Sequence, residues 1–154
     1  KSCNLIEIVE NVIQEMKSIM DEYEVKIERT IKGEVGKVKG EEVQLSRVFN
    51  NLIINAIKYN KKGVKIRISV EEKAEKVLIK VVDNGQGIPK NMRKELFKAY
   101  KKGENEDRKK RESLGNCSGL GLYIVKKIIT RLGGEIGLED SEKGAAFWLT
   151  LVKD

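Results

Sequence analysis

The sequence predicts an α+β fold, a two-layer α/β sandwich in which three main helices cover one face of a mixed, mostly antiparallel sheet. Three observations predict this class. Three segments repeat apolar residues at the spacing of three and four that marks an amphipathic helix, and five shorter segments have the apolar patterning of strands. One long polar segment without any period interrupts this order and is expected to form a flexible lid.

The composition is that of a single domain over residues 1–154. Forty per cent of the 154 residues are hydrophobic and 36% are charged, and the formal net charge of +7 favours anionic ligands. The chain has no histidine and only two cysteines, which excludes histidine catalysis, histidine-ligated metals and a disulfide framework within it. No apolar run reaches the roughly 18 residues of a membrane-spanning helix, and no signal peptide opens the sequence. We therefore expect a cytoplasmic domain.

The first half of the chain predicts two helices and three strands. The first helix covers residues 4–22, and residues 24–31, which alternate apolar and charged side chains, predict a strand. After a turn with three glycines, a second helix runs over 42–59. Two further strands, 64–72 and 76–83, are joined by the short connection KAEK, which predicts an antiparallel hairpin.

The glycine-containing turn NGQGIP at 84–89 opens the second half. A short helix near 91–99 leads into residues 101–113, which are almost all polar. Such a segment cannot bury enough surface to order itself alone, so we assign the lid to about 91–117.

A third helix and a second hairpin complete the predicted fold. The helix covers residues 118–132. The strands at 135–140 and 145–153 are joined by an SEKG turn, which indicates another antiparallel pair.

Candidate ligand-binding residues first occur on the second helix. Asn51 and Asn55 are four residues apart and Lys58 follows three later, so all three lie on one face. Two amides and a lysine suit a magnesium and phosphate site, because Mg²⁺ prefers oxygen ligands and keeps several waters. The alternative is an ordinary polar helix face.

A second candidate follows the strand that ends at Asp83. Its carboxylate can accept a hydrogen bond from an exocyclic amino group, and Gly85 and Gly87 let a flat ring lie close. A dinucleotide-binding fingerprint fits less well, because Lys90 stands where its third glycine would be and Pro89 blocks an immediate helix. The remaining alternative is a tight turn with a capping aspartate.

The start of the third helix, SGLGL at 118–122, is a third candidate. Exposed N–H groups at a glycine-rich helix start can bind an anion, although a glycine-containing N-cap is the alternative. The basic run at 98–111 is either a solvated loop or a lid that closes over a triphosphate. Nucleic-acid binding is not expected, because acidic residues dilute the run and only Tyr100 could stack on a base.

Taken in order, these motifs resemble the catalytic, ATP-binding domain of sensor histidine kinases, within the superfamily that includes gyrase, heat-shock chaperones and MutL. The resemblance covers the chain from about Cys3 to Lys153. NNLIINAIKYN resembles the N box, DNGQGIP and NCSGLGLYIVKKI resemble the two glycine boxes, ELFKAYKK looks like the F box, and GGEIGLEDSEKGAAFWLTL is similar to the closing hairpin.

The resemblance implies ATP and Mg²⁺ as cofactors and assigns roles to particular residues. Asn55, with Asn51, would hold magnesium, Lys58 would contact phosphate, Tyr59 would lie along the adenine or ribose, and Asp83 would accept the adenine amino group. The residues implied to contact the nucleotide are Asn55, Lys58, Tyr59, Asp83, Gly85, Gly87, Ile88, Tyr100, Ser118, Gly119, Leu120, Gly121 and Leu122, and those implied in catalysis are Asn51, Asn55, Lys58 and Lys102.

Further roles follow from the same resemblance. Gly85 and Gly87 would shape the floor of the base site, backbone amides from Gly119 to Gly121 would cradle phosphate, and Phe97 and Tyr100 would anchor the lid.

Three positions depart from the family pattern. Lys102 stands where an arginine often reaches toward the γ-phosphate, and a lysine lacks its bidentate fork. Cys117 replaces a glycine at the start of the second glycine box. Ala145 replaces a threonine near the adenine, so one hydroxyl of base recognition is missing or supplied by water.

Asn51 also bears on the reaction. ATP-hydrolysing members of the superfamily resemble one another in having a glutamate at this position, as a base for water, and an amide has no useful basicity. The γ-phosphoryl group is then available to a histidine. Because this chain has none, the resemblance implies a histidine on a separate dimerisation domain, from which the first helix would continue, and a response regulator receiver domain as a further partner.

Two alternatives stay open. An anti-sigma-type serine kinase is disfavoured because those proteins resemble the hydrolytic members in keeping the glutamate. A degenerate nucleotide-binding scaffold is the other, since three family positions are changed.

Overall fold

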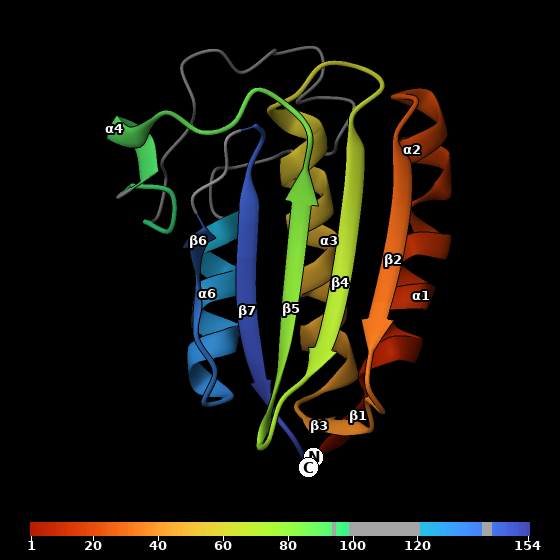
Figure 1. Cartoon of the computed structure of the whole chain (residues 1–154), viewed down its shortest axis with the longest axis vertical. Coiled ribbons are helices and arrows are strands. Elements are labelled where there is room, and N and C mark those ends of the chain that lie inside the picture. The colour runs from red at the N-terminus through yellow and green to blue at the C-terminus, as the bar shows by residue number, and fades with distance from the viewer. Residues whose placement is uncertain (94, 99–120, 140–142) are drawn as a thin grey trace.

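Five strands form the sheet in the described part of the computed structural model, which comprises residues 1–93, 95–98, 121–139 and 143–154 (Figure 1). Their order is β2-β4-β5-β7-β6. The pair β2–β4 is parallel and the other three pairs are antiparallel, so both predicted hairpins are confirmed. The strands are β2 (Lys26–Lys32), β4 (Lys65–Glu72), β5 (Lys76–Asp83), β7 (Ala146–Val152) and β6 (Ile136–Glu139).

The helices form the second layer, on one face of this sheet (Figure 1). The central helix α3 packs between α1 and α6. The predicted two-layer α+β sandwich is therefore confirmed. The helices of this layer are α1 (Leu5–Glu15), α2 (Lys17–Glu22), α3 (Glu42–Lys58) and α6 (Gly121–Arg131).

Alternating burial along the strands produces the core between the layers. In β4, in β5 and in β7 from Phe147 onward, the side chains that face the helices are buried, while their neighbours in sequence are partly exposed or exposed. The apolar stripe of α3 packs onto this face, and its largest fully buried members are Leu45, Phe49, Leu52, Ile53 and Ile57.

The predicted helix 4–22 is broken at Met16, which has φ −92° and ψ 4° and separates α1 from α2. The expectation that the first helix continues from an upstream region is wrong. The side chain of Asn4 accepts a hydrogen bond from the Glu7 N–H at 3.2 Å and caps α1, and a strand precedes it.

A two-stranded ribbon at the edge of the molecule was not predicted. β1 (Ser2–Asn4) pairs antiparallel with β3 (Lys37–Lys39). This ribbon also binds both ends of the described chain, because the Gly40 N–H donates to Lys1 O at 3.0 Å and the Asp154 N–H donates to Lys37 O at 3.0 Å. Residues 1 and 154 consequently lie together at one end of the sandwich (Figure 1).

The helix predicted near 91–99 covers only four residues in the structure. α4 (Lys90–Arg93) ends early, and residues 95–97 form a turn. The turn buries Leu96 in the core and brings the Phe97 ring edge-on to Phe147, with centroids 6.2 Å apart. Tertiary packing therefore overrides the local helical pattern.

The opposite end of the sandwich is where α3 and β5 finish and where β4 and β7 begin (Figure 1). Two stretches with the candidate ligand-binding residues, the N-box helix and the Asp83 turn, meet there.

No helix in the described residues combines the length and apolar character needed to span a bilayer.

Candidate functional site

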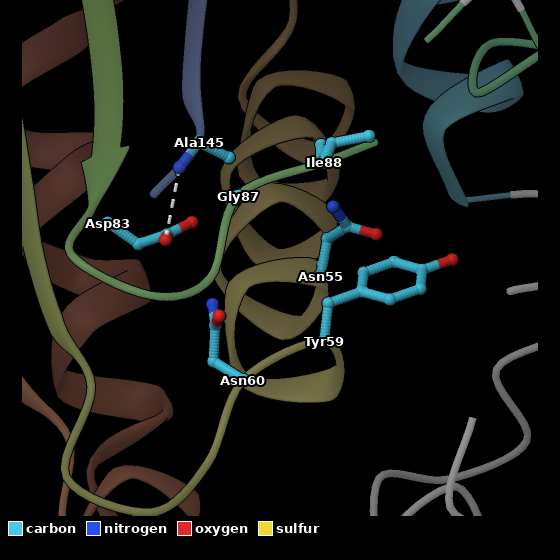
Figure 2. Close-up of a pocket in the computed structure, with 7 residues that line it drawn as sticks. All are labelled: Asn55, Tyr59, Asn60, Asp83, Gly87, Ile88 and Ala145. Carbon is cyan, nitrogen blue, oxygen red and sulfur yellow. Dashed lines mark hydrogen bonds between the residues drawn. The ribbon is translucent and has the colours of Figure 1, made fainter. Parts of the chain in front are cut away.

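A pocket opens at the end of the sandwich where α3 and β5 finish (Figure 2). It contains about 210 Å³ of empty space, including the part open to solvent. Its lining comes from the end of α3, the turn after β5 and the start of β7. The lining residues are Asn55, Tyr59, Asn60, Asp83, Gly87, Ile88 and Ala145.

Asp83 is the one buried charged side chain among the described residues, with 6% of its surface exposed. Its Oδ1 accepts hydrogen bonds from the Gly85 N–H at 2.9 Å and the Ala145 N–H at 3.2 Å. These donors fix the carboxylate at the wall of the pocket. A carboxylate held in this way is a suitable acceptor for an amino group on a flat heterocycle.

Burial raises the pKa of the Asp83 carboxyl above its ordinary value of 3.8, and hydrogen bonds from Gly85, Ala145 and Asn60 partly offset this effect. A raised pKa means that the folded state binds the proton more tightly than the unfolded state does. The proton therefore stabilises the fold fully below the ordinary pKa, and this contribution is lost as the pH rises through the raised value.

We accordingly expect the chain to gain stability relative to an Asp83→Asn variant as the pH falls toward 3.8. Urea unfolding of both proteins at a series of acidic and neutral pH values measures the difference. A relative loss of stability on acidification would show that the carboxyl pKa is depressed instead.

Two of the predicted residues on α3 reach the pocket. Asn55 and Tyr59 are one helical turn apart and extend from the same side of the helix (Figure 2). Both residues belong to the pocket lining, to which Asn55 brings an amide and Tyr59 an aromatic ring. The nearby Lys58 Nζ lies 5.1 Å from the centroid of the Tyr59 ring.

Asn51 lies one turn before Asn55 and is not among the pocket-lining residues. Its Nδ2 donates to the Gly121 carbonyl at 3.4 Å, and a Cβ built at Gly121 would lie 3.7 Å from the carbon of the same amide. Asn51 therefore joins α3 to the first turn of α6, beside the segment that was predicted to bind phosphate.

Gly87 and Ile88 line the pocket on the side of the turn, but Gly85 does not. Gly87 has φ +78°, a conformation that side chains rarely adopt, and a Cβ there would lie 3.0 Å from the Gly144 carbonyl oxygen. Gly85 instead lies against Asn60, where a Cβ would overlap the Asn60 amide.

Ala145 lies in the pocket next to Asp83. Its carbonyl oxygen accepts a hydrogen bond from the Asp83 N–H at 2.9 Å, and its own N–H donates to the Asp83 carboxylate. The sequence comparison implied that Ala145 replaces a threonine of the family, and the structure places this alanine in the pocket lining.

Only part of the predicted phosphate-binding segment lies in the described residues. Gly121 is the first described residue of α6, and Leu122 follows it. The Leu122 side chain is buried in the core with 6% exposure, so its backbone is the part left to contact a ligand. Six of the residues singled out in the sequence lie outside the described ranges, as does most of the predicted lid at 91–117. They are Tyr100, Lys102, Cys117, Ser118, Gly119 and Leu120.

Asn60 is the pocket residue that the sequence interpretation missed. Its only signal was its place directly after Tyr59, in the string NAIKYN, and an asparagine after a helix is usually interpreted as a cap or turn residue.

Residues 40–154 match the family described as histidine kinase-, DNA gyrase B-, and HSP90-like ATPase. The alginate biosynthesis sensor protein KinB of Pseudomonas aeruginosa is 28% identical over 151 residues, which are 97% of this chain and 24% of KinB. Sensor protein kinase PmrB of the same species is 32% identical over 142 residues, which are 92% of this chain and 28% of PmrB. The chain thus spans about a quarter of the length of these curated relatives.

Solved structures agree with these relatives. The nucleotide-free catalytic domain of histidine kinase ThkA superposes with a TM-score of 0.84 at 25% identity, covering 99% of this chain and 95% of that domain. The resemblance inferred from the N box, glycine boxes and closing hairpin is confirmed. The chain therefore belongs to the histidine kinase-, DNA gyrase B- and HSP90-like ATPase family, as an ATP-binding catalytic domain of the sensor histidine kinase type.

Proposed function

We propose that this domain binds Mg-ATP and transfers the γ-phosphoryl group to a histidine on a separate dimerisation domain of the same kinase. The observation that carries the proposal is the buried Asp83 carboxylate at the wall of the pocket. Asp83 accepts the adenine amino group, Tyr59 and Ile88 contact the base or ribose, and the polar mouth at Asn55 points the phosphates outward.

The donor set around Asn55 fits magnesium better than a transition metal. The described residues contain no group of three or more histidine, cysteine, aspartate or glutamate side chains that could hold a metal. Mg²⁺ is satisfied by one or two amide oxygens when phosphates and waters complete its shell. Asn55 is the first candidate ligand and Asn51 the second. When bound, the ion neutralises charge on the phosphates.

Asn51 supports transfer to a protein acceptor rather than to water. Its amide is engaged with the Gly121 carbonyl and cannot act as a base. In the reaction, the bond from the γ-phosphorus to the ADP oxygen breaks and a bond to an imidazole nitrogen forms, with the imidazole proton released. The chain contributes position and charge, with Lys58 and Lys102 near the phosphates.

The acceptor histidine belongs outside these residues, since the chain contains none. A response regulator receiver domain is the proposed next partner. The fold relative ThkA has been solved in complex with the response regulator protein TrrA, which supports this class of partner. We propose a cytoplasmic site of action, where ATP is available, and no nucleic-acid partner.

The test is a phosphotransfer assay with γ-labelled ATP and a purified histidine-bearing dimerisation domain. We expect acid-labile label on the partner only when this chain is present, and its loss when a chelator removes the metal. A partner with its histidine replaced by alanine is the matched control. If ATP binds but the label appears only as inorganic phosphate, the domain is not a histidine kinase.

A further inference from the structure

Asn60 links three separate parts of the pocket wall. Its Nδ2 donates to the Ala56 carbonyl of α3 at 2.7 Å, and its Oδ1 accepts from the Gln86 N–H at 3.2 Å. A hydrogen bond from its side chain also lowers the pKa of Asp83, against the effect of burial. Figure 2 shows this amide below the turn that runs from Asp83 to Gly87.

The same turn is held to α3 by a second hydrogen bond in the opposite direction. The Gln86 side chain donates from Nε2 to the Tyr59 carbonyl at 2.9 Å. The end of α3 and the turn after β5 therefore exchange one hydrogen bond each, Asn60 with the Gln86 backbone and Gln86 with the Tyr59 backbone. This junction lies between Tyr59 and Asp83, which both line the pocket.

Gly85 fits against this junction for a steric reason. The three atoms nearest to a Cβ built at Gly85 all belong to the Asn60 side chain, and Nδ2 is the most distant of them at 2.8 Å. Gly85 is not among the glycines with positive φ. Its backbone would thus accept an alanine, and the nearest atoms in the way are those of the Asn60 amide.

We propose that Asn60 is the positioning residue for base recognition in this domain, and that Gly85 is glycine because Asn60 occupies the space beside it. The inference rests on the proposed function, since it takes the partner of Asp83 to be the adenine amino group. Asn60 acts through Asp83 and the 84–88 turn.

The test is a double-substitution cycle read by calorimetry with ATP and with inosine triphosphate. Inosine triphosphate has a carbonyl oxygen in place of the amino group, so it lacks the exocyclic donor that the proposal assigns to Asp83. We expect Asn60→Ala to weaken ATP binding by roughly 3- to 10-fold and inosine triphosphate binding by less. A purely structural role would weaken both by the same factor and would overturn the positioning role.

Gly85→Ala is expected to weaken ATP binding by about tenfold or more, because the new methyl displaces the Asn60 amide. The double variant Asn60→Ala/Gly85→Ala should bind ATP about as well as Asn60→Ala alone, since the space is then free. Two losses that multiply would mean that Gly85 and Asn60 act independently, which overturns the pairing.

Gly36→Ala is the matched control, because a Cβ at Gly36 meets nothing within 4 Å. Unfolding curves of each variant establish that the proteins compared are folded. If the parent chain itself binds no ATP, the proposed function fails. If the parent binds ATP and the losses multiply, the proposed function stands and this inference fails.

Discussion

Asp83→Asn is expected to weaken ATP binding by about 10- to 100-fold, the loss that follows when a hydrogen bond to a charged group, about 1.5–3 kcal/mol, is removed. Asparagine has nearly the same shape, and its Oδ1 can still accept from the Gly85 and Ala145 N–H groups that hold the carboxylate. Its second position carries donor hydrogens, which oppose the donor hydrogens of the adenine amino group.

Calorimetric titration of both proteins with a non-hydrolysable ATP analogue measures this effect. The matched control is Asp21→Asn, which changes an exposed aspartate on α2 and should leave the affinity unchanged. If Asp83→Asn binds the analogue as tightly as the parent, the buried carboxylate is not the base acceptor.

Gly144→Ala is expected to cost at least about 3 kcal/mol of stability and to abolish ATP binding. Gly144 has φ +79°, which costs a residue with a side chain about 1–2 kcal/mol. A Cβ there would overlap the Asp83 carbonyl oxygen and lie 2.7 Å from its carbonyl carbon and 3.0 Å from its Oδ1. The end of β5 and the residues before β7 must then move apart, which breaks the hydrogen bonds between Asp83 and Ala145.

Two other glycines separate the causes of this loss. Gly63 has φ +87° with open space around its Cβ position, so Gly63→Ala reports the cost of conformation alone, about 1–2 kcal/mol. Gly36→Ala has neither effect and should stay within about 0.5 kcal/mol of the parent. Denaturant unfolding ranks the three variants. Equal losses at Gly144 and Gly63 would show that contact with Asp83 adds nothing.

The sequence was sufficient for the main elements and for the residues whose pattern carries their chemistry. Helical and alternating periodicity located α3, β4, β5 and β7, because one face of each is buried and the other is not. Asp83 could be selected because a carboxylate at the end of an apolar strand, followed by a glycine-containing turn, suits an amino group on a flat ring.

Features that depend on contacts distant in sequence could not be predicted. β1 and β3 are three residues each, too short to show a period, and they form because they pair with each other. The helix over 91–99 gives way to a turn because Leu96 and Phe97 pack against the core.

The glycine turn shows the same limit within the site. Gly85 and Gly87 look equivalent in the sequence, and both were expected to let a ring approach. Only Gly87 lines the pocket and has a positive φ, while Gly85 accommodates the Asn60 amide from another element. The sequence shows that a glycine stands at position 85, but it does not show that the Asn60 side chain is the neighbour that requires a glycine there.

Both chain ends are held by the β1–β3 ribbon, at the end of the sandwich opposite the pocket (Figure 1). Anything covalently joined to either terminus is consequently attached at the end of the domain that carries the β1–β3 ribbon. If the domain pivots about that attachment, the pocket sweeps a wider arc than the β1–β3 ribbon does. A small change in the angle of the attachment would therefore displace the pocket much further than it displaces the ribbon.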